Sequence, residues 1–214
     1  MKKQWLASLI CLSALSAGPL FAAPSEVLIA DYNLAARGDA DKVTLVYQQL
    51  TAQIEAQGAD ALSLVYLGST QTLMGRDAWM PWNKMKYTEQ GLATISKGLV
   101  LLASQPVALD KQARIQGLPE SLLARSIAAS TFTSLPDMFN HFERGYDLFL
   151  DLLDEPSFTQ QPIEATSWVY LYAIKAALKG GDKAQGEAWV AQLQRLYPQH
   201  TVVAQAQALL RDAA

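Results

Sequence analysis

The chain has 214 residues, half of them apolar and 17% charged, which suits one compact domain and excludes an intrinsically disordered protein. Seventeen basic against 20 acidic residues give a net charge of −3, so the composition also argues against direct binding of nucleic acid.

The first residues are typical of a secretory signal peptide. Lys2 and Lys3 precede an apolar run from Trp5 to Leu15, which is shorter than the roughly 20 residues that a transmembrane helix needs. Small residues follow the run. We predict cleavage after Ala22, because cleavage one residue later would place Pro24 beside the scissile bond.

This cleavage would divide the chain into a signal peptide, residues 1–22, and one mature domain, residues 23–214. The single cysteine, Cys11, lies inside the signal peptide, so the mature domain depends on an apolar core rather than on disulfides. We expect a periplasmic protein of a Gram-negative bacterium, or a secreted one, with no transmembrane anchor after cleavage.

Beyond Pro24, apolar residues recur at intervals of three and four, which is the period of amphipathic helices. Helices are expected to begin at Ser25, Asp39 and Asp60, because such side chains cap N-termini, and to end near glycines such as Gly58 and Gly75. Later helices are predicted over residues 81–102, 119–132, 136–155, 162–179, 182–197 and 201–211, and a loop with a short helix over 103–117. No strand is predicted. The expected fold is all-α, with about eight or nine helices.

The last predicted helices approximate a tetratricopeptide (TPR) unit. The matching positions are Trp168, Leu171, Ala184, Ala191 and Pro198, and the turn Gly181-Asp182 repeats the earlier turn Gly38-Asp39. Gly68 stands where two helices of such a unit must approach closely. We therefore expect a TPR-like α-α superhelix of antiparallel helix pairs, although several signature positions hold other residues.

Two stretches carry a family resemblance. Residues 75–87, GRDAWMPWNKMKY, and residues 135–139, LPDMF, resemble a group of uncharacterised exported bacterial proteins with TPR-like helices. The resemblance covers most of the mature chain and implies a helical-repeat fold. It implies no activity, cofactor or ligand residue.

The densest group of candidate binding residues lies between two predicted helices. It consists of Arg76, Trp79, Trp82, Lys84 and Tyr87. Indoles and cations together can hold an extended peptide or an anionic group, so these residues are the candidate partner-binding site, with Arg76 as an anion anchor. The alternative is structural: the two indoles cover the end of a helix pair, and Arg76 pairs with Asp77.

A second candidate surface is acidic. Glu143, Asp147, Asp151 and Asp154 recur at intervals of three and four on one predicted helix. They form either a solvated outer face or a docking surface for a basic partner. A hydrolase could use two of them as acid and base, but neighbouring carboxylates on a solvated helix lack the apolar setting of an acid catalyst.

Other motifs are few. His141 and His200 are far apart in the sequence and have no cluster of metal-ligand spacing around them, so we expect no metal site and no cofactor. Trp168 and Tyr172 share a helix face and are expected to pack in the core. Tyr170, which points elsewhere, is the expected groove-facing residue.

A curved stack of helix pairs binds its ligands on an inner surface. The first hypothesis is a non-enzymatic periplasmic adaptor or assembly factor that holds a protein segment. The alternative is a carrier of a small molecule or lipid, with a pocket lined by Phe139, Phe142 and Trp168. An envelope hydrolase is the third.

Overall fold

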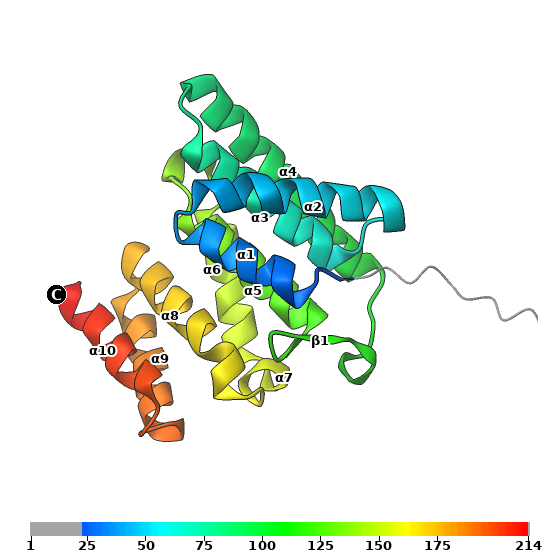
Figure 1. Ribbon diagram of the computed structural model, residues 1–214. Coiled ribbons are helices and arrows are strands. Elements are labelled where there is room, and N and C mark those ends of the chain that lie inside the picture. The colour runs from blue at the N-terminus through cyan, green and yellow to red at the C-terminus, as the bar shows by residue number, and fades with distance from the viewer. Residues whose placement is uncertain (1–22, 214) are drawn as a thin grey trace, which may run out of the picture.

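The computed structural model describes residues 23–213, and the predicted signal peptide lies outside them. The all-α prediction is confirmed: the described residues form ten α-helices, two single 3₁₀ turns and one hairpin of two-residue strands (Figure 1).

The helices of the N-terminal half are α1 (Glu26–Ala36), α2 (Ala40–Gln57), α3 (Ala61–Asp77) and α4 (Pro81–Ser104). The segment after α4 contains the 3₁₀ turn η1 (Leu109–Lys111) and the antiparallel strands β1 (Arg114–Ile115) and β2 (Leu118–Pro119). The remaining elements are α5 (Glu120–Ser134), the 3₁₀ turn η2 (Asp137–Phe139), α6 (Phe142–Asp154), α7 (Pro156–Thr159), α8 (Ile163–Lys179), α9 (Lys183–Leu196) and α10 (Thr201–Asp212).

The expected helix starts are confirmed. The side chain of Ser25 accepts a hydrogen bond from the backbone N–H of Leu28, and Asp60 accepts one from that of Ser63. Asp39 caps α2 in the same way. Each cap satisfies one of the backbone donors that a helix N-terminus leaves unpaired, so these residues place the first turn of α1, α2 and α3.

Three local predictions were wrong. Gly75 does not end α3, which continues to Asp77. Pro136 opens only the 3₁₀ turn η2, because Asn140 takes a left-handed conformation with φ of 54° and breaks the chain direction before α6. The segment over residues 103–117 holds a short helix, η1, as expected, but the expectation of no strand was wrong, because β1 forms a hairpin with β2 that turns through the positive φ values of Gln116 and Gly117.

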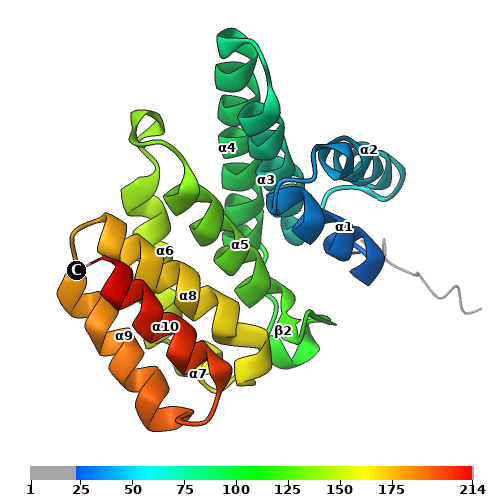
Figure 2. The same cartoon turned by 60° about the vertical axis from the view of Figure 1, so that its left-hand side comes forward.

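The helices pack as successive neighbours. α3 and α4 form the closest antiparallel pair, α5 pairs with α6, and α8 pairs with α9, against which α10 also lies (Figure 2). α5 is the central helix, since it contacts α3, α4, α6 and α8 and most of its residues are buried. The apolar core runs continuously through these contacts.

Glycines allow α3 and α4 to touch along their backbones. A Cβ atom on Gly68 would lie 2.6 Å from the carbonyl oxygen of Gly91, and one on Gly98 would lie 2.8 Å from that of Ala61. The close approach expected at Gly68 is therefore confirmed. Figure 2 shows the α3–α4 pair extending beyond the other helices, and the turn between them, residues 78–80, is the tip of this extension. We call residues 76–87 the hairpin tip.

Within residues 23–213, no helix combines the length and the apolar character needed to span a membrane.

Candidate functional site

A cleft of about 740 Å³ lies below the hairpin tip. Its walls come from α1, α3, the start of α4, the end of α5, η2 and α8. The apolar lining residues include Leu73, Met85, Leu135, Met138 and Phe139. The hydroxyl-bearing lining residues are Tyr32, Ser69, Thr72, Thr88, Ser130, Thr131, Ser134 and Tyr172, and the cationic ones are Arg76 and Lys84.

A chain of hydrogen bonds crosses the floor of this cleft. The Tyr32 hydroxyl lies 2.6 Å from Ser69 Oγ, which lies 2.7 Å from Thr131 Oγ1. Thr131 donates to the carbonyl oxygen of Ile127 at 2.8 Å, so it must accept from Ser69, and Ser69 must accept from Tyr32. The chain therefore runs in one direction and connects α1, α3 and α5.

Tyr32 is a neutral hydrogen-bond donor at neutral pH, and its burial favours this form further. Its side chain is enclosed, and its ring packs edge-on against the ring of Tyr66 with centroids 4.8 Å apart. Burial raises the pKa of Tyr32 above its ordinary value, although the hydrogen bond with Ser69 opposes this. A neutral phenol at neutral pH is consistent with the direction of the chain.

The remaining hydroxyl groups on the floor of the cleft, those of Thr72, Ser130 and Ser134, donate hydrogen bonds to carbonyl oxygens of their own helices. Thr72 donates to the carbonyl oxygen of Ser69 at 2.7 Å, Ser130 to that of Ile127 at 2.9 Å, and Ser134 to that of Ser130 at 2.6 Å. These hydroxyls therefore present lone pairs, rather than hydrogens, to the cleft.

The cations lie at the mouth of the cleft. Arg76 pairs with Asp77, with Nε 2.6 Å from Oδ1, and its Nη atoms donate to the carbonyl oxygens of Ala35 and Ala36 at the end of α1. The hydrogen bond to Asp77 raises the pKa of Arg76 further above its ordinary value. Lys84 Nζ donates to the carbonyl oxygen of Arg76 at 3.0 Å. The local pairing of Arg76 with Asp77, which the structural interpretation expected, is present.

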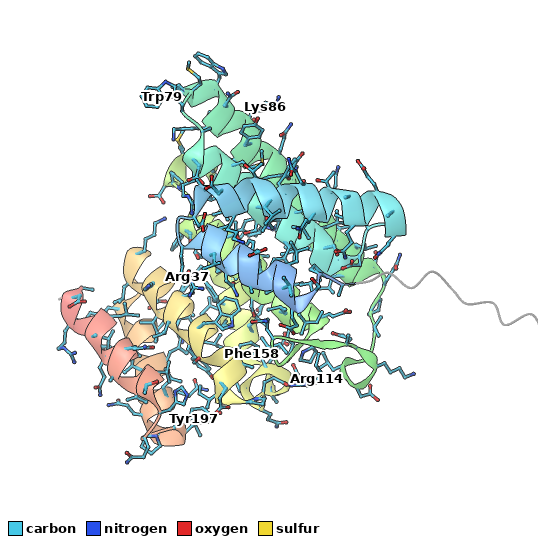
Figure 3. The ribbon with its side chains drawn as sticks, in the orientation of Figure 1. Arg37, Trp79, Lys86, Arg114, Phe158 and Tyr197 are labelled. Carbon is cyan, nitrogen blue, oxygen red and sulfur yellow. The ribbon has the colours of Figure 1, made fainter. Side chains whose placement is uncertain are left out.

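The predicted partner-binding residues are only partly brought together. Arg76 and Lys84 line the cleft, whereas Trp79 and Trp82 stand outside it on the hairpin tip. Trp79 is 88% exposed and Trp82 is 66% exposed (Figure 3 labels Trp79). The two indoles therefore do not cover the end of the helix pair. Tyr87 is half-buried on another face of α4, with Lys86 Nζ 5.9 Å from its ring centroid.

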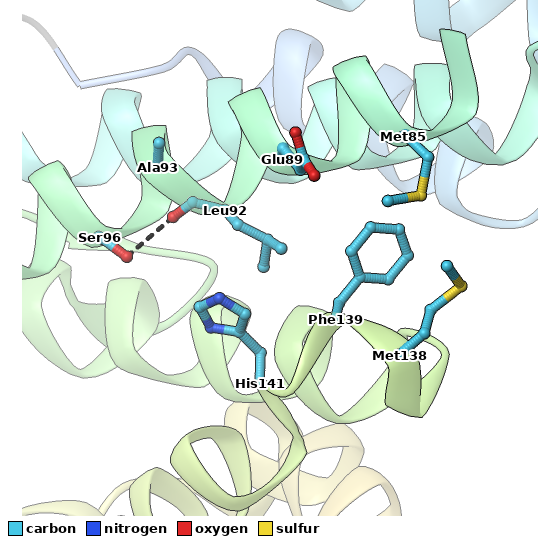
Figure 4. Close-up of a pocket in the computed structure, with 8 residues that line it drawn as sticks. All are labelled: Met85, Glu89, Leu92, Ala93, Ser96, Met138, Phe139 and His141. Carbon is cyan, nitrogen blue, oxygen red and sulfur yellow. Dashed lines mark hydrogen bonds between the residues drawn. The ribbon is translucent and has the colours of Figure 1, made fainter. Parts of the chain in front are cut away.

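A smaller pocket of about 350 Å³ adjoins the cleft and shares Met85, Met138 and Phe139 with it (Figure 4). His141 also lines this pocket, and the centroid of its ring lies 5.1 Å from that of the Phe132 ring. Nδ1 of His141 is buried, with no hydrogen-bond partner among the residues that the structure describes. Burial lowers the pKa of His141, and the charge of Arg144 lowers it further.

A third pocket, of about 360 Å³, lies on the other side of Tyr32 and is lined by Trp168 and Tyr172. The prediction for the aromatic residues of α8 was wrong: Tyr170 is buried in the core, and Tyr172 is exposed at the cleft. Burial raises the pKa of Tyr170 to about 12. Of the residues expected to line one carrier pocket, Phe139 lines the cleft and Trp168 this third pocket, while Phe142 packs against the core.

The acidic residues of α6 point into solvent. Glu143, Asp147, Asp151 and Asp154 are all exposed. Asp147 and Asp151 border a shallow pocket together with Arg125 and Arg144. The next carboxylate along the chain, Glu155, pairs with Arg125 at 2.7 Å, and this hydrogen bond lowers the pKa of Glu155. The surface is therefore exposed in this chain, with arginines at its edge.

Across residues 23–213, no three His, Cys, Asp or Glu side chains form a group suited to a metal ion. The floor hydroxyls are the site residues that the sequence analysis missed. Their signal was present, because Ser69 and Thr72, and likewise Ser130, Thr131 and Ser134, recur at helical spacing on otherwise apolar helices.

Comparison of the chain with protein-family models, with curated proteins and with solved structures finds no match.

Proposed function

We propose that this chain is a non-enzymatic adaptor or assembly factor of the bacterial envelope, which is exported to the periplasm and holds a segment of a partner protein at the hairpin tip. One observation carries the proposal: Trp79 and Trp82, 88% and 66% exposed, lie three residues apart on the projecting hairpin tip. Large aromatic side chains dominate the energy of protein interfaces, and leaving two of them in water is unfavourable unless something covers them.

The tip is also anchored to the rest of the fold. The backbone contacts at Gly68 and Gly91 hold α3 against α4, and Arg76 attaches the tip to the end of α1 through Ala35 and Ala36. A preorganised surface loses little conformational entropy when a partner binds. Two cations of the tip, Lys84 and Lys86, are exposed two and four residues after Trp82 in α4, so an acidic or aromatic segment would suit the tip.

The proposal includes a TPR-like stack. Contacts between helices run from each pair to the next along the chain, as in a solenoid in which each repeat touches its neighbours. α1 and α8 both line the third pocket, which supports a stack that curves around an inner surface.

The experiment is photo-crosslinking in living cells. A photoreactive amino acid at position 79 is expected to capture one dominant envelope protein. The matched control is position 100, because Val100 is also exposed and lies near the opposite end of α4. Capture of the same protein from both positions, or of none from position 79, would contradict the proposal.

A second candidate, a carrier of a small molecule or lipid, is supported by a different observation. The cleft of about 740 Å³ lies within the range of about 300 to 1,000 Å³ typical of ligand pockets. Solvent extraction of the purified protein followed by mass spectrometry tests this candidate. A defined compound in stoichiometric amount supports it, and an empty extract argues against it.

A further inference from the structure

The hydrogen-bond donors of the cleft are unevenly distributed. Six lining hydroxyls, those of Tyr32, Ser69, Thr72, Ser130, Thr131 and Ser134, donate to other atoms of the protein. An anionic group needs donors, so the floor of the cleft is a poor place for one. A hydroxyl or amide N–H of a ligand would instead find free lone pairs there.

The mouth of the cleft, in contrast to its floor, offers free hydrogen-bond donors and positive charge. Lys84 Nζ gives one hydrogen to the carbonyl oxygen of Arg76 and keeps two, and within the described chain no carboxylate pairs with it. Thr88 lies one helical turn further along α4, on the same face, and also lines the cleft. No Asp or Glu is among the lining residues, and Asp77 neutralises only Arg76, so the charge of Lys84 at the mouth is uncompensated.

The apolar wall begins beside these donors. Met85 follows Lys84 directly, and Met138 and Phe139 face it across the cleft from η2, as Figure 4 shows for the region that the cleft shares with the smaller pocket. Methionine side chains are flexible and adapt to chains of varying shape. Met138 is exposed, so the apolar wall continues outward to the rim.

We propose that the cleft binds an amphipathic monoanion, an acid with a single apolar chain, whose acidic group lies at Lys84 and Thr88 and whose chain lies between Met85, Met138 and Phe139. This inference gives the carrier candidate its ligand class. It concerns a different site from the protein contact proposed for Trp79 and Trp82, because neither indole lines the cleft, although Lys84 borders both sites. A chain that carries a hydroxyl group would additionally satisfy the lone pairs of the floor.

The first test compares three probes with the same chain: dodecanoate, dodecanol and dodecylamine. Each is titrated against the mature protein carrying a bound dansyl-labelled undecanoic acid, and its displacement is followed by fluorescence. Dodecanoate is expected to bind about tenfold more tightly than dodecanol, because a charge-assisted hydrogen bond adds to the same apolar contact. Dodecylamine should bind weakest. Equal affinity for the acid and the alcohol, or no binding of any probe, would overturn the inference.

The second test uses variants. Lys84→Met should weaken dodecanoate about tenfold and leave dodecanol unchanged. Lys86→Met is the matched control, since Lys86 is an exposed lysine of the same helix that does not line the cleft. An equal effect of the two variants would show general attraction to positive charge and would overturn the assignment to Lys84.

A third variant fills the cleft. Ser134 lines it, is exposed and lies in the last turn of α5, so Ser134→Trp should abolish binding of dodecanoate without disturbing the core. Circular dichroism verifies the fold of each variant. Binding retained in Ser134→Trp would place the ligand elsewhere. Crosslinking from position 79 in Ser134→Trp separates the two proposals, because the partner should still be captured when the cleft is filled.

Discussion

At the residue scale, the tryptophans of the described chain differ sharply in their surroundings. Trp79 and Trp82 are exposed on the hairpin tip, whereas Trp189 is 3% exposed and packs edge-on against Tyr146, with ring centroids 6.2 Å apart. Tryptophan thus packs in the core in α9, whereas at the hairpin tip it is exposed and accessible to a partner.

This contrast predicts the effect of alanine on stability. Trp79→Ala and Trp82→Ala should each change the free energy of unfolding by no more than about 0.5 kcal/mol, as at other surface sites. Trp189→Ala should lower it by about 3 to 5 kcal/mol, because it leaves a cavity in the core. Urea unfolding measures all three. A loss of several kcal/mol in Trp82→Ala would show that the indole supports the fold.

The burial of His141 leads us to expect that the free energy of unfolding depends on pH. Its pKa lies below the ordinary value of 6.5 in the folded protein, so the unfolded chain takes up the proton at a higher pH than the folded chain does. Stability should therefore decrease as the pH falls below about 6.5. In His141→Gln this part of the decrease should disappear. Urea unfolding at about pH 7.5 and about pH 5.5 compares the two proteins, and an identical decrease in both would contradict the burial argument.

Single residues were predictable where their partners are local. Ser25, Asp39 and Asp60 cap helices through groups three residues away, so the sequence alone identifies them. Tyr170 and Tyr172 were assigned the wrong way round, because their exposure depends on helices that are distant in the sequence. Tyr170 packs beside Phe158, and Tyr172 faces the cleft near Tyr32 of α1.

At the element scale, the α3–α4 pair depends on glycines inside helices. Gly68→Ala should lower the free energy of unfolding by about 1 to 3 kcal/mol, because the new methyl group would overlap the backbone of α4. Gly186→Ala in α9 is the matched control. Its Cβ would meet its nearest neighbour at 3.7 Å, an ordinary contact, so the change should be neutral or stabilising by about 1 kcal/mol. Similar losses in both variants would contradict the close approach.

Two errors at this scale share a cause. Gly75 was expected to end α3, but it lies where Thr88 and the backbone of Lys84 approach, so it is a contact point rather than a stop. Pro136 was expected to open a long helix, but η2 and Asn140 intervene and bring Met138 and Phe139 to the cleft. Glycine and proline in a sequence indicate a helix end, a turn or a close backbone contact, and the tertiary structure decides which of these forms.

At the scale of the whole molecule, the acidic face of α6 and the hairpin tip are far apart. Asp147 borders a pocket with Leu99, which lies roughly 25 Å along α4 from Trp82 at about 1.5 Å per residue. Asp147→Asn combined with Asp151→Asn should therefore leave partner capture from position 79 unchanged. Loss of capture in this double variant, with the fold intact, would bring the acidic face into the interface.

The cleft itself could not be predicted. Its walls come from α1, α3, α4, α5, η2 and α8, and its floor is a hydrogen-bond chain among Tyr32, Ser69 and Thr131. The helical period indicates that such hydroxyls share one face of their own helix, but it does not indicate which faces of different helices pack against each other. The sequence was sufficient for the all-α class, most helix boundaries and the composition of the tip, because these depend on local patterns.

The central claim is that Trp79 and Trp82 bind a partner and do not support the fold. Its most direct test is the dissociation constant of the crosslinked partner, once identified, for the wild-type protein and for Trp79→Ala combined with Trp82→Ala, with Val100→Ala as control. We predict binding weakened at least about tenfold in the double variant alone, as for aromatic residues that dominate an interface. Equal dissociation constants for all three proteins would contradict the claim.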